Sequence, residues 1–309
     1  MSDSLIFIDT NIYLDFYRGI TKTFEKSMIN HIENNLNRII FTDQILMEYK
    51  KNRQKVMLDT FNQITIELSA QNIPAFLAEG KQGKSILKKI QDLKKQIETL
   101  KNSLHLSLLN PTKKDPIYKC MQNIIKREPL YYLNQSNEKY DSILNLATKR
   151  FKQGFPPKKN NDTSIGDAVN WEWIIACAET SKKDIILISR DTDYGITIKK
   201  DTILNDWLEH EFHERVSNKR KILLTNKLSS AMKLININIS KREEDEEEKI
   251  ITNTTIEQNV NKSTGLLSLL SGEEFALLSN NAKPRLNALL TFNDILGRSQ
   301  ISDKNNKEK

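Results

Sequence analysis

The stretch Leu5-Ile6-Phe7-Ile8-Asp9-Thr10-Asn11 decides the fold, because it joins a run of apolar residues to a polar turn. Four successive apolar residues are typical of a strand that is covered on both faces, as in a parallel sheet between helices. Asp9 follows this strand directly. Its carboxylate is therefore expected at the carboxyl edge of the sheet, where open α/β folds bind their ligands.

Further apolar runs predict the other strands of this sheet, at 38–41, 185–188 and 222–224. Between and after them, apolar residues at helical spacing predict helices at 12–17, 45–68, 168–178 and 204–214, and a last one that ends near 234. Alternating strands and helices indicate an α/β fold with a parallel central sheet and helices on both faces.

Residues 81–155 interrupt the alternation and predict an inserted helical arm. Their apolar residues recur four and three apart, in a heptad pattern: Ile86, Ile90, Leu93, Ile97, Leu100 and Leu104. The flanking lysines predict either a solvated helix face or sequence-independent contacts to phosphates. The chain is therefore divided into 1–80 and 156–240, two parts of one α/β domain, the arm 81–155, and 241–309. This last segment is expected to hold an acidic linker (243–248) and a helical C-terminal tail.

Composition restricts the classes of partner and the compartment. The 309 residues carry a net charge of +7, which favours polyanions such as RNA, DNA or an anionic membrane surface, although a basic surface without a function fits equally. Cys120 and Cys177 lie far apart, so neither a disulfide framework nor a zinc pattern is predicted. Neither a signal peptide nor a membrane-spanning run is expected, and we predict a cytoplasmic protein.

Four acidic residues are expected to meet at the carboxyl edge of the sheet: Asp9, Glu48, Asp167 and Asp191. Carboxylates that lie close together raise one another's pKa values unless a cation neutralises them. Oxygen donors without Cys or His select Mg²⁺ or Mn²⁺ over zinc, and such ions activate water for attack on a phosphodiester. Each acid alone also fits a structural role in a turn, at a helix start or on a solvated helix face.

In their order along the chain, these motifs resemble those of PIN domains. Phe7-Ile8-Asp9-Thr10-Asn11 resembles the opening motif, and Glu48-Tyr49-Lys50-Lys51-Asn52-Arg53 the glutamate-bearing helix. Pro156-Pro157, Asp162 and Gly166-Asp167-Ala168-Val169-Asn170-Trp171 resemble the third acidic motif, and Ile188-Ser189-Arg190-Asp191-Thr192-Asp193-Tyr194 the closing motif. The resemblance covers residues 4–235 and is closest to a larger bacterial subgroup with a helical insertion.

The resemblance implies a Rossmann-like PIN fold and a metal-dependent nuclease that usually acts on RNA. It implies catalytic and metal-binding roles for the four carboxylates Asp9, Glu48, Asp167 and Asp191. Three polar side chains are expected to orient them: Asn11, Ser189 and Asp193. Three basic side chains are expected to contact substrate phosphates: Arg53, Lys88 and Lys95. Arg53 fits a helix salt bridge equally well. Asp162 is a spare acid near this site.

The leading hypothesis is therefore an endoribonuclease that depends on Mg²⁺ or Mn²⁺. Small bacterial relatives imply a role as a toxin or as an effector of antiviral defence. A structure-selective DNase of the flap-nuclease type and a non-catalytic PIN-like binding module are the alternatives. The apolar tail after Glu248 predicts binding to an antitoxin, a partner subunit or a second copy of the chain.

Overall fold

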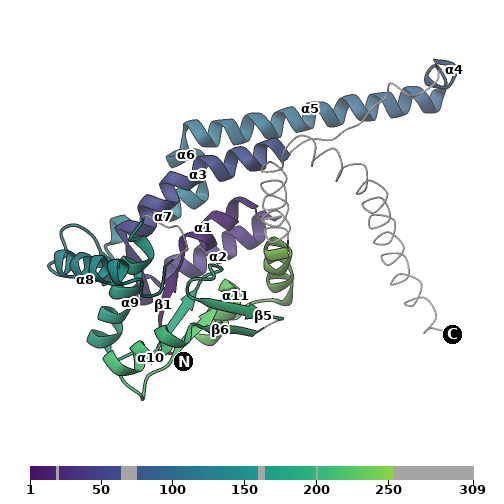
Figure 1. The fold of residues 1–309 in the computed structure, drawn as a ribbon. Helices are drawn as coiled ribbons and strands as arrows, with labels where there is room; N and C mark the ends of the chain where they lie inside the picture. Colours follow the sequence, from purple (N-terminus) through teal and green to yellow (C-terminus); the bar gives the residue numbers. More distant parts are fainter. Residues whose placement is uncertain (19–20, 64–74, 159–163, 200, 253–309) are drawn as a thin grey trace, which may run out of the picture. The chain divides into compact units, whose positions relative to one another are not determined.

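The computed structural model describes residues 1–252, apart from 19–20, 64–74, 159–163 and 200 (Figure 1). The tail from 253 onward, with its predicted helices, lies outside the described residues. The strands are β1 (Leu5–Ile8), β2 (Ile39–Thr42), β3 (Tyr131–Leu133), β4 (Ile185–Ile188), β5 (Gly195–Ile198), β6 (Asp201–Leu204) and β7 (Ile222–Thr225).

The helices divide into those before, within and after the insertion. Before it come α1 (Thr10–Asp15), α2 (Lys22–Asn34) and α3 (Asp43–Gln63). The insertion holds α4 (Ala75–Ala78), α5 (Lys81–Leu109), α6 (Pro111–Lys114), α7 (Pro116–Arg127) and α8 (Tyr140–Gln153). After it come α9 (Gly166–Ser181), α10 (Asp206–Arg215) and α11 (Leu228–Leu234). Two 3₁₀ turns are η1 (Phe16–Arg18) and η2 (Leu36–Arg38).

The central sheet has five parallel strands in the order β3-β2-β1-β4-β7. Ile6 of β1 is in register with Ile39 of β2, and Ile8 of β1 with Ile188 of β4. Because the chain leaves β1 toward β2 on one side and returns to β4 on the other, the switch point of the topology lies at β1 and β4. The predicted α/β fold with a parallel sheet is confirmed.

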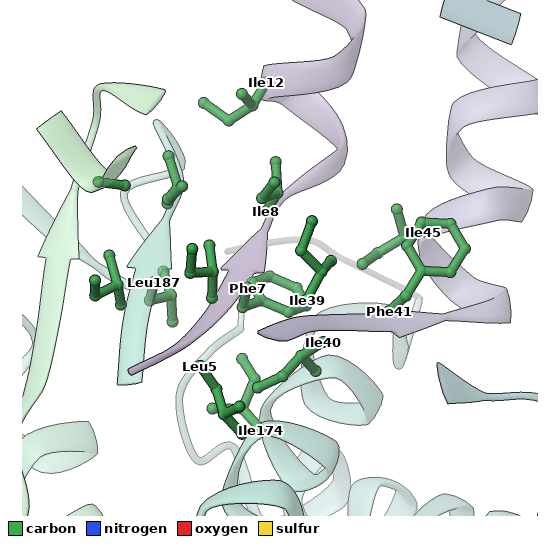
Figure 2. Packing of buried hydrophobic residues seen from close by; sticks show 14 of the residues in the cluster. Leu5, Phe7, Ile8, Ile12, Ile39, Ile40, Phe41, Ile45, Ile174 and Leu187 are labelled. Atoms are coloured by element: carbon green, nitrogen blue, oxygen red, sulfur yellow. The ribbon is translucent and has the colours of Figure 1, made fainter. Parts of the chain in front are cut away.

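The core explains why the apolar runs form strands. Every residue of β1 and of β4 is buried, as expected for strands covered on both faces. In Figure 2, Ile12 of α1 lies above the strands and Ile174 of α9 below them. Both side chains belong to the buried core, together with Phe7 and Leu187. This sandwich holds the carboxyl ends of β1 and β4 in a fixed relation.

The prediction for residues 81–155 was partly wrong. A single 29-residue helix, α5, does carry the heptad pattern, and it contacts α3. In contrast, α7 packs against α2, β3 is an edge strand of the central sheet, and α8 packs against α9. The segment from α7 onward therefore belongs to the body of the α/β domain. Three residues of strand are too few to produce a recognisable alternation, so β3 escaped the sequence analysis.

The acidic run 243–248 is also not the predicted linker. Residues 241–252 are helical, and Glu246 and Glu247 are buried. The two carboxylate oxygens of Glu247 accept hydrogen bonds from the backbone N–H groups of Leu228 and Ser229, at 2.6 and 2.9 Å. These are donors at the start of α11 that have no partner inside the helix, so Glu247 satisfies them from outside.

Three smaller features complete the description. β5 and β6 form an antiparallel hairpin that was not predicted, and Ile196, Ile198 and Ile203 of this hairpin are exposed. Cys120 and Cys177 are both buried and form no disulfide. Among the described residues, no helix is long and apolar enough to cross a membrane.

Candidate active site

The site lies at the carboxyl edge of the sheet, where β1 and β4 end side by side. The backbone N–H of Asp9 donates to the carbonyl of Ile188 at 2.9 Å, which continues the sheet by one hydrogen bond beyond β1. The Asp9 side chain then caps α1, because its Oδ1 accepts from the backbone N–H of Thr10 at 2.6 Å. Strand pairing and capping together point this carboxylate along the helix start and leave it only 3% exposed.

A cleft of about 270 Å³ opens above Asp9. All four predicted carboxylates line it: Asp9, Glu48, Asp167 and Asp191. They come from four separate parts of the chain, namely the end of β1, the helix α3, the first turn of α9 and the loop after β4. The parallel topology places these ends on one edge, so acids that are far apart in sequence share one cavity.

Two polar side chains orient Asp9. Asn11 donates to Oδ2 of Asp9 at 2.8 Å, and the hydroxyl of Ser189 donates to the same oxygen at 2.5 Å. The Ser189 hydroxyl also accepts from the backbone N–H of Asp191 at 3.0 Å. Ser189 therefore links the carboxylate after β1 to the loop that carries Asp191.

Glu48 is oriented by a separate set of contacts. The hydroxyl of Thr10 donates to Oε2 of Glu48 at 3.0 Å, and the amide of Gln44 donates to Oε1 at 2.6 Å. Gly166 lets the start of α9 approach this pair, since a Cβ at that position would lie 2.6 Å from Oε1 of Glu48 and 2.3 Å from Nε2 of Gln44. The first turn of α9, with Asp167, can therefore lie against α3.

The electrostatics of the cleft are those of crowded carboxylates. Burial raises the pKa of Asp9 well above its ordinary value, and the negative charge of Asp191 raises it further. Asp167 and Glu48 act in the same direction, while the hydrogen bond from Ser189 opposes them. In the absence of a cation, the carboxyl of Asp9 therefore keeps its proton to a higher pH than an exposed aspartate does. A positive ion in the cleft would lower the pKa again.

Tyr194 lies beneath the acids and was not predicted to take part in the site. Its ring is fully buried and tilts against Phe7, with the ring centroids 6.4 Å apart. Burial raises the pKa of Tyr194 well above its ordinary value, and the nearby charges of Asp167 and Asp9 add to this effect. Its hydroxyl is buried without a hydrogen-bond partner among the described residues.

The donor set suits a hard divalent cation. The cleft offers carboxylate and amide oxygens, and neither Cys nor His lines it. Oδ1 of Asn11 is a buried acceptor that has no hydrogen-bond partner in the described part of the chain, and it lies beside Asp9. Across the described ranges, no group of three acidic, His or Cys side chains is close enough to hold a metal ion as it stands.

Comparison with known families agrees with this geometry, since the PIN domain family model matches residues 6–194. The chain belongs to the PIN domain family. PIN domains make up a nuclease superfamily whose members generally use divalent metal ions, and a nucleic acid is therefore the class of substrate. No curated protein and no solved structure matches the chain.

Arg53 of this PIN domain does not lie where a substrate phosphate would bind. It is 3% exposed, and its guanidinium pairs with Asp115 at 2.7 Å. Its Nε donates to Asp115 at 2.8 Å, and Nη2 donates to the carbonyl of Ser107 at 2.8 Å. The predicted phosphate contact is therefore corrected: Arg53 ties α3 to the end of α5 and to the start of α7.

The other predicted residues are placed as follows. Lys88 and Lys95 are exposed on α5 and do not line the cleft. Asp193 is half-buried in the turn after β4, and it too is not one of the residues that line the cleft. Asp162 lies outside the described residues.

Seven further residues that line the cleft were not predicted as site residues: Thr10, Leu14, Gln44, Met47, Lys51, Asn52 and Ser164. Three of them share one face of α3 with Glu48, because positions 44, 48, 51 and 52 are separated by three or four residues. That spacing was available in the sequence once Glu48 had been singled out. Thr10 had no such signal, since its contact with Glu48 spans 38 positions.

Proposed function

We propose that this PIN domain is a divalent-metal-dependent endoribonuclease, in which Asp9, Glu48, Asp167 and Asp191 hold the ion. The observation that supports the proposal is the cleft that all four carboxylates line, with Asp9 buried at its base. A bound Mg²⁺ or Mn²⁺ would polarise the scissile phosphate and lower the pKa of a water molecule.

The side chains around the carboxylates have positioning roles in this proposal. Asn11 and Ser189 hold Asp9, so that its carboxylate points into the cleft before an ion arrives. Thr10 and Gln44 do the same for Glu48. This preorganisation reduces the entropy that would be lost when the ligands are brought together.

The experiment is cleavage of fluorescently labelled single-stranded RNA, and of DNA of the same sequence, with Mg²⁺ or Mn²⁺. Asp9→Asn and Asp191→Asn are expected to slow RNA cleavage by about a hundredfold or more, since even residues that only orient ligands cost about 10- to 100-fold. Asp92→Asn removes an exposed carboxylate on α5 and is the control of equal charge change. Unaltered cleavage by the two site variants contradicts the assignment. Faster cleavage of DNA than of RNA contradicts the endoribonuclease proposal and supports a DNase.

The biological role that we propose is that of a toxin or defence effector whose tail binds a partner. The structure moves the boundary for a test of the tail, because residues 241–252 form a helix with two buried glutamates. A truncation after 252 is therefore the suitable variant. Loss of a co-purifying partner, or of self-association, on truncation supports the role, and equal behaviour of the two forms contradicts it.

A further inference from the structure

The helix α3 presents a solvent-facing ridge that continues out of the cleft. Met47 and Lys51 line the cleft, and Lys55 and Leu58 follow at positions four and seven residues beyond Lys51. Residues at this spacing lie on one face of a helix, and eleven residues span about 16 Å. We call these four residues the α3 ridge: Met47, Lys51, Lys55 and Leu58.

The opposite face of α3 fixes the direction of this ridge. Ile45, Tyr49 and Val56 are buried in the core, so the helix cannot rotate to hide its outer residues. Met47 and Leu58 are consequently 46% and 51% exposed, although both are large and apolar. Single exposed apolar residues are common, but here two of them flank two lysines on one ridge.

Within the described part of the chain, no acidic side chain pairs with either lysine of the ridge, Lys51 or Lys55. The neighbouring cleft holds four carboxylates, which repel a phosphate backbone. Positive charge at the rim of the cleft therefore favours the binding of a polyanion there. Lys51 is the basic residue that lines the cleft.

We propose that the α3 ridge binds single-stranded nucleic acid and guides the strand into the cleft. Lys51 and Lys55 would contact successive phosphates, and Met47 and Leu58 would pack against unstacked bases. The inference rests on the proposed nuclease function, since it assigns a substrate form to that site. Two basic side chains flanked by apolar ones suit a single strand, because a duplex keeps its base faces stacked inside and offers mainly phosphates to such a ridge.

The test is fluorescence anisotropy with labelled single-stranded RNA and with a hairpin duplex, in the absence of divalent ions so that cleavage does not interfere. Lys51→Gln/Lys55→Gln is expected to weaken single-strand binding about tenfold, and to reduce the slope of log K against log salt by about 1.4, or about 0.7 for each phosphate contact. The matched control is Lys149→Gln/Lys152→Gln, which removes the same charge from exposed positions of α8. This control is expected to change the affinity by less than about twofold.

Met47→Ala tests the base contact separately, because it leaves the charge of the ridge unchanged. It is expected to weaken single-strand binding about two- to tenfold, the range for a thioether that packs on an aromatic ring, and to leave duplex binding unchanged. Equal losses in the two lysine pairs, duplex binding as tight as single-strand binding, or no binding by the wild type would each overturn the proposal. Ridge-dependent binding without any cleavage would instead refute only the nuclease function.

Discussion

Glu247→Gln removes a buried carboxylate that lies far along the chain from the cleft acids. The Glu247 side chain is 2% exposed and accepts backbone hydrogen bonds from Leu228 and Ser229. It also lies 3.6 Å from Nη2 of Arg190, which stands between Ser189 and Asp191 and pairs with Asp15 as well. The helix 241–252 is thereby joined to the loop that carries a candidate ligand.

The magnitude follows from the groups that the substitution leaves behind. Glutamine keeps one acceptor oxygen, so one buried backbone N–H at the start of α11 loses its partner, at a cost of about 1–3 kcal/mol. Arg190 retains Asp15 but loses its second carboxylate, and the total loss of unfolding free energy is expected to be about 2–4 kcal/mol. Glu248→Gln is the matched control. The Glu248 side chain is 55% exposed and pairs with Lys227 at the surface, and such pairs contribute about 0–1 kcal/mol.

The assay is urea unfolding followed by circular dichroism, on the full chain and on both variants. Because Arg190 neighbours Asp191, Glu247→Gln is also expected to slow RNA cleavage under conditions in which the protein remains folded, whereas Glu248→Gln is not. Equal losses below about 1 kcal/mol in the two variants would refute the reasoning, since Glu247 could then not be buried against α11 as described.

Three further predictions concern the site and its support. Burial raises the pKa of Asp9, so the metal-free wild type loses stability as pH rises through that pKa. Asp9→Asn should therefore melt at a higher temperature than the wild type at neutral pH. This difference in melting temperature should shrink as pH falls toward 3.8. Added Mn²⁺ should reverse the order, because the ion stabilises the wild type. Gly166→Ala displaces the ends of flexible side chains, including the carboxylate of Glu48, so it should cost less than about 1 kcal/mol in urea unfolding while it slows cleavage about a hundredfold. Arg53→Met leaves Asp115 buried without its cation and should lower the free energy of unfolding in urea by about 3–5 kcal/mol, with KM for RNA unchanged. A raised KM at unchanged stability would instead support a contact between Arg53 and a substrate phosphate.

The main strands and the candidate ligands could be predicted because their signals are local. An unbroken apolar run such as 185–188 is typical of a strand that is covered on both faces, and an acid that follows such a strand is expected at the carboxyl edge. The alternation of these runs with helices determined the parallel fold. It also indicated that Asp9 and Asp191 would lie at one edge, which the structure confirms through the cleft that both residues line.

Charge pairing, in contrast, was decided only by the tertiary structure. Arginine and glutamate are usually exposed. From the sequence, a phosphate contact was therefore predicted for Arg53, and a position in a linker for Glu247. Their partners are remote, since Asp115 lies 62 positions from Arg53, and Leu228 lies 19 positions from Glu247. An apolar side chain reports its burial through periodicity, but the partner of a charged one depends on distances through space. The sequence by itself therefore determined the sheet and the positions of the acids along it, while the packing of α3, α7 and the helix 241–252 decided which charges are buried and which remain on the α3 ridge.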